Sequence, residues 1–144
     1  MLTAGLGIEV SVPPGWIRVP NDEFPVAFAG PIAAGYHPTI ALAHEEFDPP
    51  TADGLAAGIA LLRVEQAATY EGYELLAERE EEIAGRWAYV QHFRWQAEVP
   101  LTQLLALIVL RPGLVLKVDG ACLTELADHH LPVLDDIVRS VTPG

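Results

Sequence analysis

The pattern of hydrophobic and polar positions is clearest between residues 86 and 111, where it predicts two long strands joined by a short turn at Val99-Pro100. Side chains alternate between the two faces of a strand. The first strand has one aromatic face, formed by Trp87, Tyr89, Phe93 and Trp95, and a second face formed by Ala88, Val90, His92 and Arg94. The second strand is apolar on both faces, with Leu105, Leu107 and Val109 on one and Leu104, Ile108 and Leu110 on the other. Both faces of the predicted sheet must therefore be covered.

The remaining pattern predicts five more strands and two helices. Three strands at residues 7–12, 24–29 and 39–47 end at proline or glycine, and a strand at 73–83 has one acidic face. A helix over residues 51–68 is predicted from Thr51 as N-cap and from the spacing of Leu55, Ile59 and Leu62. After a strand at 114–119, a C-terminal helix with Asp128 as N-cap carries the apolar stripe Leu131, Leu134, Ile137, Val138 and Val141.

Long hairpins between two helices indicate an α+β fold rather than alternating βαβ units. We expect a curved antiparallel sheet of about six or seven strands with two main helices, in the order βββ-α-ββββ-α. No linker or repeat interrupts the pattern, and we expect residues 1–144 to form a single domain. Trp16, which follows the Pro13-Pro14-Gly15 stop, is predicted to be a packing residue.

Composition excludes several classes of partner. The chain is 51% hydrophobic, yet its net charge is -12, and its eight basic residues are scattered. Nucleic acids and anionic membrane surfaces bind clustered Lys and Arg, so neither is an expected partner. The single cysteine, Cys122, excludes an intramolecular disulfide, and no apolar run reaches the ~20 residues needed to span a bilayer. The N-terminus has no leader pattern, and we expect a cytoplasmic protein without direct membrane insertion.

Candidate catalytic chemistry is sparse. His44 and Glu46 share a strand face, and Asp128, His129 and His130 are adjacent, but neither set has the spacing of a metal site. Cys122 is more typical of a small buried hydrophobe than of a nucleophile, and neither serine of the chain lies in a GxSxG motif. We therefore expect no metal, no cofactor and no enzymatic activity.

The opening SVPPGW, the GRWAY that begins the aromatic strand, Gln103 in the next strand and the closing LDDIVRSV resemble the PsbP/DcrB-like superfamily. Its bacterial members include the LpqN-type proteins and the Eag-type chaperones of type VI secretion effectors. The resemblance implies a non-enzymatic protein with a curved sheet and flanking helices, which binds a protein, a peptide or an apolar segment. In the chaperone branch one sheet face holds apolar helices of a client, and the proteins are homodimers.

The aromatic stripe has two interpretations: core beneath a helix, or a partner-binding surface. Two helices are few for covering both faces of this sheet, and monomers rarely leave large apolar patches exposed. We therefore predict a partner-binding face formed by Trp87, Tyr89, Phe93, Trp95, Gln103, Leu105 and Leu107. The expected function is that of a chaperone or adaptor for an apolar segment of a partner protein. The alternative is a carrier that encloses a small lipophilic ligand between sheet and helices.

Overall fold

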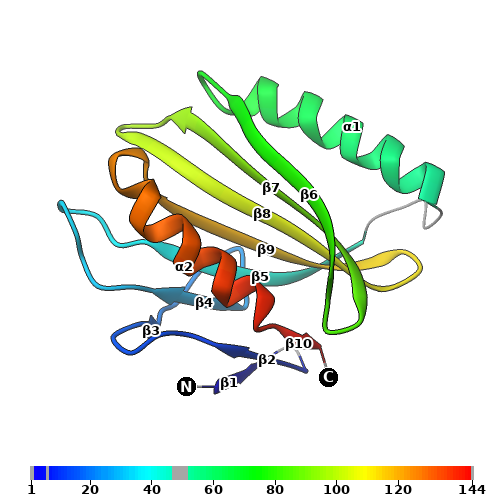
Figure 1. Cartoon of the computed structure of the whole chain (residues 1–144), viewed down its shortest axis with the longest axis horizontal. Helices are drawn as coiled ribbons and strands as arrows, with labels where there is room; N and C mark the ends of the chain where they lie inside the picture. The colour runs from blue at the N-terminus through cyan, green and yellow to red at the C-terminus, as the bar shows by residue number, and fades with distance from the viewer. Residues whose placement is uncertain (1, 6, 47–51, 144) are drawn as a thin grey trace.

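The computed structural model describes residues 2–5, 7–46 and 52–143 (Figure 1). In chain order, the elements of these residues are β1 (Leu2–Gly5), β2 (Ile8–Ser11), β3 (Ile17–Arg18), β4 (Val26–Ala29), β5 (Thr39–Glu46), α1 (Ala52–Thr69), β6 (Glu74–Ile83), β7 (Arg86–Gln96), β8 (Pro100–Arg111), β9 (Leu114–Leu123), a 3-10 turn (Thr124–Leu126), α2 (Ala127–Arg139) and β10 (Thr142–Pro143).

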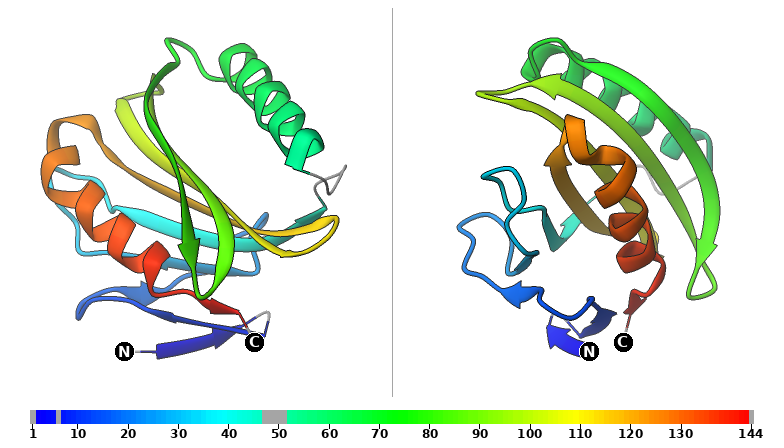
Figure 2. Two further views of the ribbon diagram at one scale, coloured as in Figure 1. Left: turned by 45° about the vertical axis from the view of Figure 1, so that its right-hand side comes forward. Right: turned by 60° about the vertical axis from the view of Figure 1, so that its left-hand side comes forward.

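Seven of these strands form one antiparallel sheet in the order β3-β4-β5-β9-β8-β7-β6. The sheet is open and strongly curved, and α1 and α2 lie on opposite sides of it (Figure 2). Within this sheet and its two helices the chain order is βββ-α-ββββ-α. The predicted α+β class, strand number and element order are therefore confirmed.

One predicted strand belongs elsewhere. Residues 7–12 contain β2, which pairs with β1 and β10 in a separate three-stranded sheet that joins the two ends of the chain. The first strand of the main sheet is instead β3, only two residues long, which the sequence did not indicate. Two residues are too few for an alternating pattern to be recognised.

The main core lies between the sheet and α2. Val90 on β7, Leu104 and Ile108 on β8, and Leu116 on β9 are fully buried against Leu134, Ile137 and Val138 of α2. Ile8 and Val10 of β2 close the same core from the small sheet, together with Trp16, which is 6% exposed. The predictions of an apolar stripe on the C-terminal helix and of a packing role for Trp16 are confirmed.

Strand β9 is longer than predicted. The strand predicted over residues 114–119 continues through Gly120 and Ala121 to Leu123. A Cβ atom on Gly120 would lie 3.2 Å from Cδ1 of Leu134. Gly120 therefore marks a close approach of α2 to the sheet. Close approach of another element is a common reason for a glycine inside a strand.

The start of α2 also differs from the prediction. Its N-cap is Leu126, with no side-chain cap, and Asp128 lies inside the first turn. Asp128 still contributes there, because a carboxylate near a helix N-terminus interacts favourably with the helix dipole. Pro132 consequently lies inside the helix, where it cannot donate a backbone hydrogen bond to the preceding turn.

Helix α1 lies on the other side of the sheet, above β6, β7 and β8 (Figures 1 and 2). We call this side of the sheet the α1 face. The predicted helix over residues 51–68 is confirmed as α1, but Thr51, its predicted N-cap, and Phe47, at the end of the third predicted strand, lie outside the described residues. In residues 2–5, 7–46 and 52–143, no helix has the length and hydropathy needed to cross a bilayer.

Candidate functional site

The register of β7 and β8 brings the seven predicted site residues onto the α1 face. Phe93 pairs with Gln103, Tyr89 with Leu107 and Trp95 with Leu101. Paired residues point to the same side of a sheet, so the aromatic stripe of β7 and its predicted flank on β8 form one continuous surface. Leu105 belongs to this surface through its pairing with Gln91.

Helix α1 covers one part of this surface. Ile59 packs against Tyr89, Leu107 and Val115, and all four side chains are buried. Trp87 and Val109 are only partly buried at the edge of the cluster, beside Leu62 of α1. Tyr89 and Leu107 are therefore core residues beneath α1 in this structure.

The chain that follows α1 covers the other aromatic residues. Tyr70 lies against both Phe93 and Trp95, with ring centroids 5.2 and 4.8 Å apart, and Tyr73 lies 5.4 Å from Phe93. Phe93 is only 2% exposed, whereas Trp95 is partly exposed. Of the predicted aromatic residues, Trp87 and Trp95 thus retain accessible surface, at the two ends of the stripe.

Beneath α1 the sheet also carries a chain of hydrogen-bonded polar side chains. Gln66 of α1 donates to Gln91, Gln91 donates to the hydroxyl of Tyr89 over 3.0 Å, and that hydroxyl donates to Glu78 over 2.7 Å. Tyr73 donates to Gln66 over 3.0 Å. Gln91 is not among the predicted site residues, although its position between Tyr89 and Phe93 in the alternating stripe assigns it to this face.

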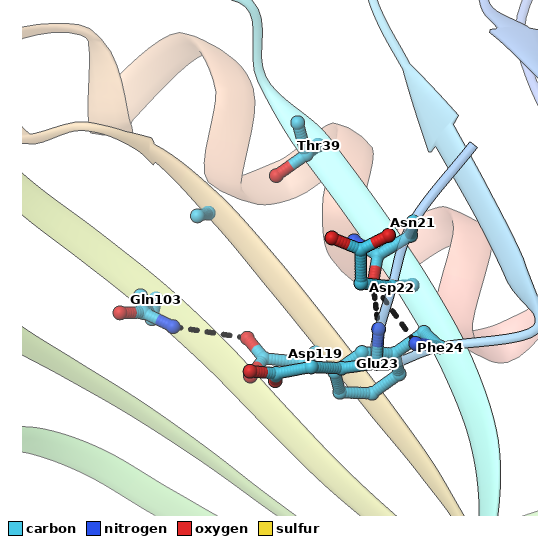
Figure 3. A pocket seen from close by; sticks show the side chains of 9 residues that line it. Asn21, Asp22, Glu23, Phe24, Thr39, Gln103 and Asp119 are labelled. Atoms are coloured by element: carbon cyan, nitrogen blue, oxygen red, sulfur yellow. Dashed lines mark hydrogen bonds between the residues drawn. The ribbon is translucent and has the colours of Figure 1, made fainter. Parts of the chain in front are cut away.

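A hollow of about 390 Å³ opens on the uncovered part of the α1 face (Figure 3). Its floor is formed by Thr39 and Ala41 of β5, Gln103 of β8, and Asp119 and Ala121 of β9. The loop before β4 forms its wall, where the Asn21 side chain accepts hydrogen bonds from the backbone amides of Glu23 and Phe24 at 2.8 and 2.9 Å. Apart from Gln103, the residues of this site were not predicted from the sequence, because they come from segments far apart in the chain.

Trp95, Gln103 and Asp119 connect the aromatic stripe to this hollow. The indole Nε1 of Trp95 donates to Oε1 of Gln103. Nε2 of Gln103 in turn donates to Oδ1 of Asp119 over 2.9 Å, as Figure 3 shows. These two bonds fix the orientation of the Gln103 amide. Gln103 therefore holds a tryptophan at the edge of the aromatic stripe and a carboxyl group on the floor of the hollow.

The hollow is electrostatically negative. Burial raises the pKa of Asp119 from 3.8 to about 6, and the charge of Glu23 adds to this, while the Gln103 hydrogen bond and Lys117 act in the opposite direction. The positive charge of Lys117 also interacts with two other groups: its Nζ lies 3.5 Å from Glu45 and 5.9 Å from the centre of the Phe24 ring. Burial, followed by the charges of Asp119 and Glu23, raises the pKa of Tyr70. Tyr70 follows α1 and lies against Trp95, whose indole donates to Gln103 on the floor, so the end of α1 lies beside the hollow.

The groups that could have supported catalysis or metal binding are separate from this site. Cys122 is fully buried on the α2 side, where burial raises the pKa of its thiol to about 11. It is therefore protonated at neutral pH and packs as the sequence predicted. In the part of the chain that the structure describes, no group of three His, Cys, Asp or Glu side chains lies close enough to hold a metal ion.

The opposite face of β7 and β8 is not a free surface. Val90, Leu104 and Ile108 are fully buried beneath α2. His92 lies at the edge of that core, with Nε2 3.2 Å from Oδ1 of Asp135. Asp135 also accepts a bond of 2.8 Å from Arg79. Burial alone would raise the pKa of Asp135, but the hydrogen bonds from His92 and Arg79 outweigh it and hold that pKa below its usual value.

Comparison with known proteins identifies the fold. No family model matches the sequence, and no curated protein matches it at a significant level. Among solved structures, cyanobacterial PsbP (CyanoP) from Synechocystis sp. PCC 6803 is 17% identical with a TM-score of 0.73, over 100% of this chain and 92% of that one.

Two further structures agree with this likeness. LpqN of Mycobacterium tuberculosis, which is involved in cell envelope biogenesis, is 17% identical with a TM-score of 0.71, over 94% of this chain and 82% of that one. The Ran-binding protein Mog1p of Saccharomyces cerevisiae is 13% identical with a TM-score of 0.61, over 94% of this chain and 89% of that one. At these identities the likeness is one of architecture, and it shows that the chain has the PsbP-like fold that its sequence resembles.

Proposed function

We propose that this protein is a non-enzymatic adaptor or chaperone that binds an apolar segment of a partner protein on the uncovered part of the α1 face. The bound segment lies in the hollow between the end of α1 and the loop before β4, with Trp95 at its edge. Gln103 and Asp119 supply hydrogen-bonding groups on the floor.

The observation that carries this proposal is the incomplete cover of the α1 face, which leaves the hollow open beside the aromatic stripe. The apolar contacts of α1 reach Tyr89, Leu107 and Val115, whereas the hollow begins farther along β8 and β9, at Gln103 and Asp119. Small side chains, Ala41 and Ala121, form the apolar part of that floor. A peptide backbone can approach the sheet closely over such residues, and a partly exposed tryptophan such as Trp95 beside them is a typical anchor for binding.

The fold neighbours are compatible with this role. Mog1p is a Ran-binding protein, so a PsbP-like fold can bind a protein partner. The carrier alternative has less support, since the hollow on the α1 face is open to solvent and does not enclose a ligand between sheet and helix. Enclosure of most of the ligand surface is typical of small-molecule sites.

The test uses a fluorescein-labelled 20-residue helical peptide of leucine and alanine with lysine ends. We expect saturable binding to the wild-type protein, measured by fluorescence anisotropy. Ala121→Leu should fill the floor of the hollow, and Trp95→Ala should remove the anchor, so each should weaken binding about tenfold or more, the usual effect at a binding hot spot.

Ile17→Ala is the matched control, because Ile17 is 61% exposed on β3 at the edge of the sheet, outside the hollow. Its peptide affinity should equal that of the wild type. Equal peptide binding by wild type, Ala121→Leu and Trp95→Ala would reject the proposed surface. Saturable binding of decanoate together with no binding of the peptide would favour the carrier function instead.

A further inference from the structure

A second hollow, of about 340 Å³, lies at the start of α2 and shares no residue with the hollow on the α1 face. Its walls are mostly apolar and include four proline rings and the indole of Trp16. His129 and His130 of α2 and the indole of Trp16 are its nitrogen-bearing side chains. The site is therefore a mostly apolar hollow with a few hydrogen-bonding groups.

The walls of this hollow are held in place by the fold. Trp16 is buried against the backbone of Gly30, where a Cβ atom would lie only 2.7 Å from the indole ring. The amide of Gly30 donates to the carbonyl of Pro38 over 2.8 Å, and Nδ1 of His37 lies 2.7 Å from the carbonyl oxygen of Gly30. Proline rings have a fixed φ, so these loops lose little freedom when a ligand binds.

His130 is the unusual residue of this hollow. It is only 9% exposed, and its Nδ1 is buried without a hydrogen-bond partner among the residues that the structure describes. Burial, followed by the neighbouring His129, lowers the pKa of His130, so its ring is neutral at pH 7. A neutral imidazole has its proton on one nitrogen only.

The burial of Nδ1 decides which nitrogen carries that proton. A proton on Nδ1 would be a buried donor without an acceptor, which is more costly than a bare acceptor nitrogen at the same place. The proton therefore resides on Nε2. Because His130 lines the hollow while its Nδ1 is withdrawn from it, the Nε2–H edge of the ring is the one that faces the hollow.

We propose that this hollow binds a small, uncharged apolar molecule that carries a carbonyl group. The apolar body of the ligand packs on Trp16 and the proline rings, and its carbonyl oxygen accepts a hydrogen bond from Nε2 of His130. A carboxylate fits less well, since a neutral imidazole does not compensate its charge and the protein already has a net charge of -12. The volume is at the lower end of the range of known ligand sites and suits a ligand built on a single ring.

The test compares two ligands of nearly equal shape, acetophenone and α-methylstyrene, in which a methylene group replaces the carbonyl oxygen. Binding is followed by ¹H–¹⁵N NMR, through the indole resonance of Trp16 and the imidazole nitrogens of His130. We expect acetophenone to shift both sets of signals and to bind about three- to tenfold more tightly than α-methylstyrene, the factor expected from one hydrogen bond.

The His130→Phe variant should bind both ligands equally, because it keeps an apolar ring and loses the donor. His129→Phe is the matched control, since His129 also lines the hollow but is exposed, and it should keep the preference for acetophenone. The proposal is overturned if acetophenone leaves the Trp16 signal unchanged, or if the preference survives in His130→Phe or disappears in His129→Phe. If His130→Phe fails to fold, the wild-type ¹⁵N spectrum tests the proposal instead. A proton on Nδ1 of His130 at pH 7.5 would also overturn the proposal.

Discussion

Gln66 of α1 and Gln91 of β7 are joined by a buried hydrogen bond of 2.5 Å, donated by Nε2 of Gln66 to Oε1 of Gln91. Gln66 and Ile59 are the two buried side chains among residues 58–69 of α1. By contrast, α2 buries His130, Leu134, Ile137 and Val138. The attachment of α1 to the sheet therefore depends to a large extent on polar contacts, with the Gln66–Gln91 pair at their centre.

The first prediction follows from that pair. Gln91→Ala should leave the Nε2 group of Gln66 buried without an acceptor, at a cost of about 1–3 kcal/mol. Amide hydrogen exchange, followed by mass spectrometry, should show lower protection in α1 and unchanged protection in α2. Gln96→Ala is the control, because Gln96 is exposed on the same strand. Equal protection of α1 in wild type and Gln91→Ala would contradict this interpretation.

The second prediction concerns Trp16, which is buried in the main core. Trp16→Ala should lower the free energy of unfolding by about 3–5 kcal/mol, since it removes a large buried side chain and leaves a cavity. Urea denaturation measures this change. Trp87→Ala, at a partly buried position, should have a smaller effect. An unchanged urea midpoint for Trp16→Ala would show that Trp16 is not a core residue.

The third prediction concerns the pH dependence introduced by Asp119, whose pKa is raised from 3.8 to about 6. The folded state keeps this proton to higher pH than the unfolded state, so the contribution of Asp119 to stability is present at low pH and is lost as pH rises through about 6. Asp119→Asn cannot ionise and still offers Gln103 an acceptor. It should therefore be more stable than wild type at pH 7.5, by at most about 3 kcal/mol.

The measurement is the difference in unfolding free energy between Asp119→Asn and wild type at several pH values. That difference should disappear near pH 4, where Asp119 is protonated in the folded wild type. A difference that is constant between pH 4 and 7.5 would mean that Asp119 does not titrate in this range.

The fourth prediction is that the protein forms a homodimer through the outer side of α1. Leu61 and Val64 are 59% and 66% exposed there, three residues apart on one side of the helix. Light scattering at micromolar concentration should report twice the chain mass of 15.6 kDa. Leu61→Lys and Val64→Lys should give the monomer mass, because a charged side chain in an apolar interface is unfavourable.

Ile17→Lys provides the control for this prediction, since it places the same charge at a similarly exposed position on the sheet edge. It should remain dimeric. A wild-type protein that is monomeric across a hundredfold range of concentration, or a dimer that survives both α1 substitutions, would rule out this interface.

The sequence by itself determined the long hairpin and the apolar faces of its strands. Alternation in β7 and apolar residues on both faces of β8 are local signals, because each follows from the two-residue period of a strand. They predicted the long hairpin, and they placed the aromatic side chains on a single face. The spacing of Leu134, Ile137 and Val138 in the same way predicted the buried side of α2.

Only the tertiary structure decided what covers each face and where the hollows lie. Tyr70 follows α1, yet it packs on Phe93 and Trp95, and the hollow brings Thr39 and Asp119 together across β5 and β9. Such contacts depend on strand order and helix placement, which no local period specifies. Gly120 is an example of what the local sequence does not specify, because a glycine at this position is compatible with a turn. Only the approach of Leu134 from α2 explains why a glycine lies inside β9.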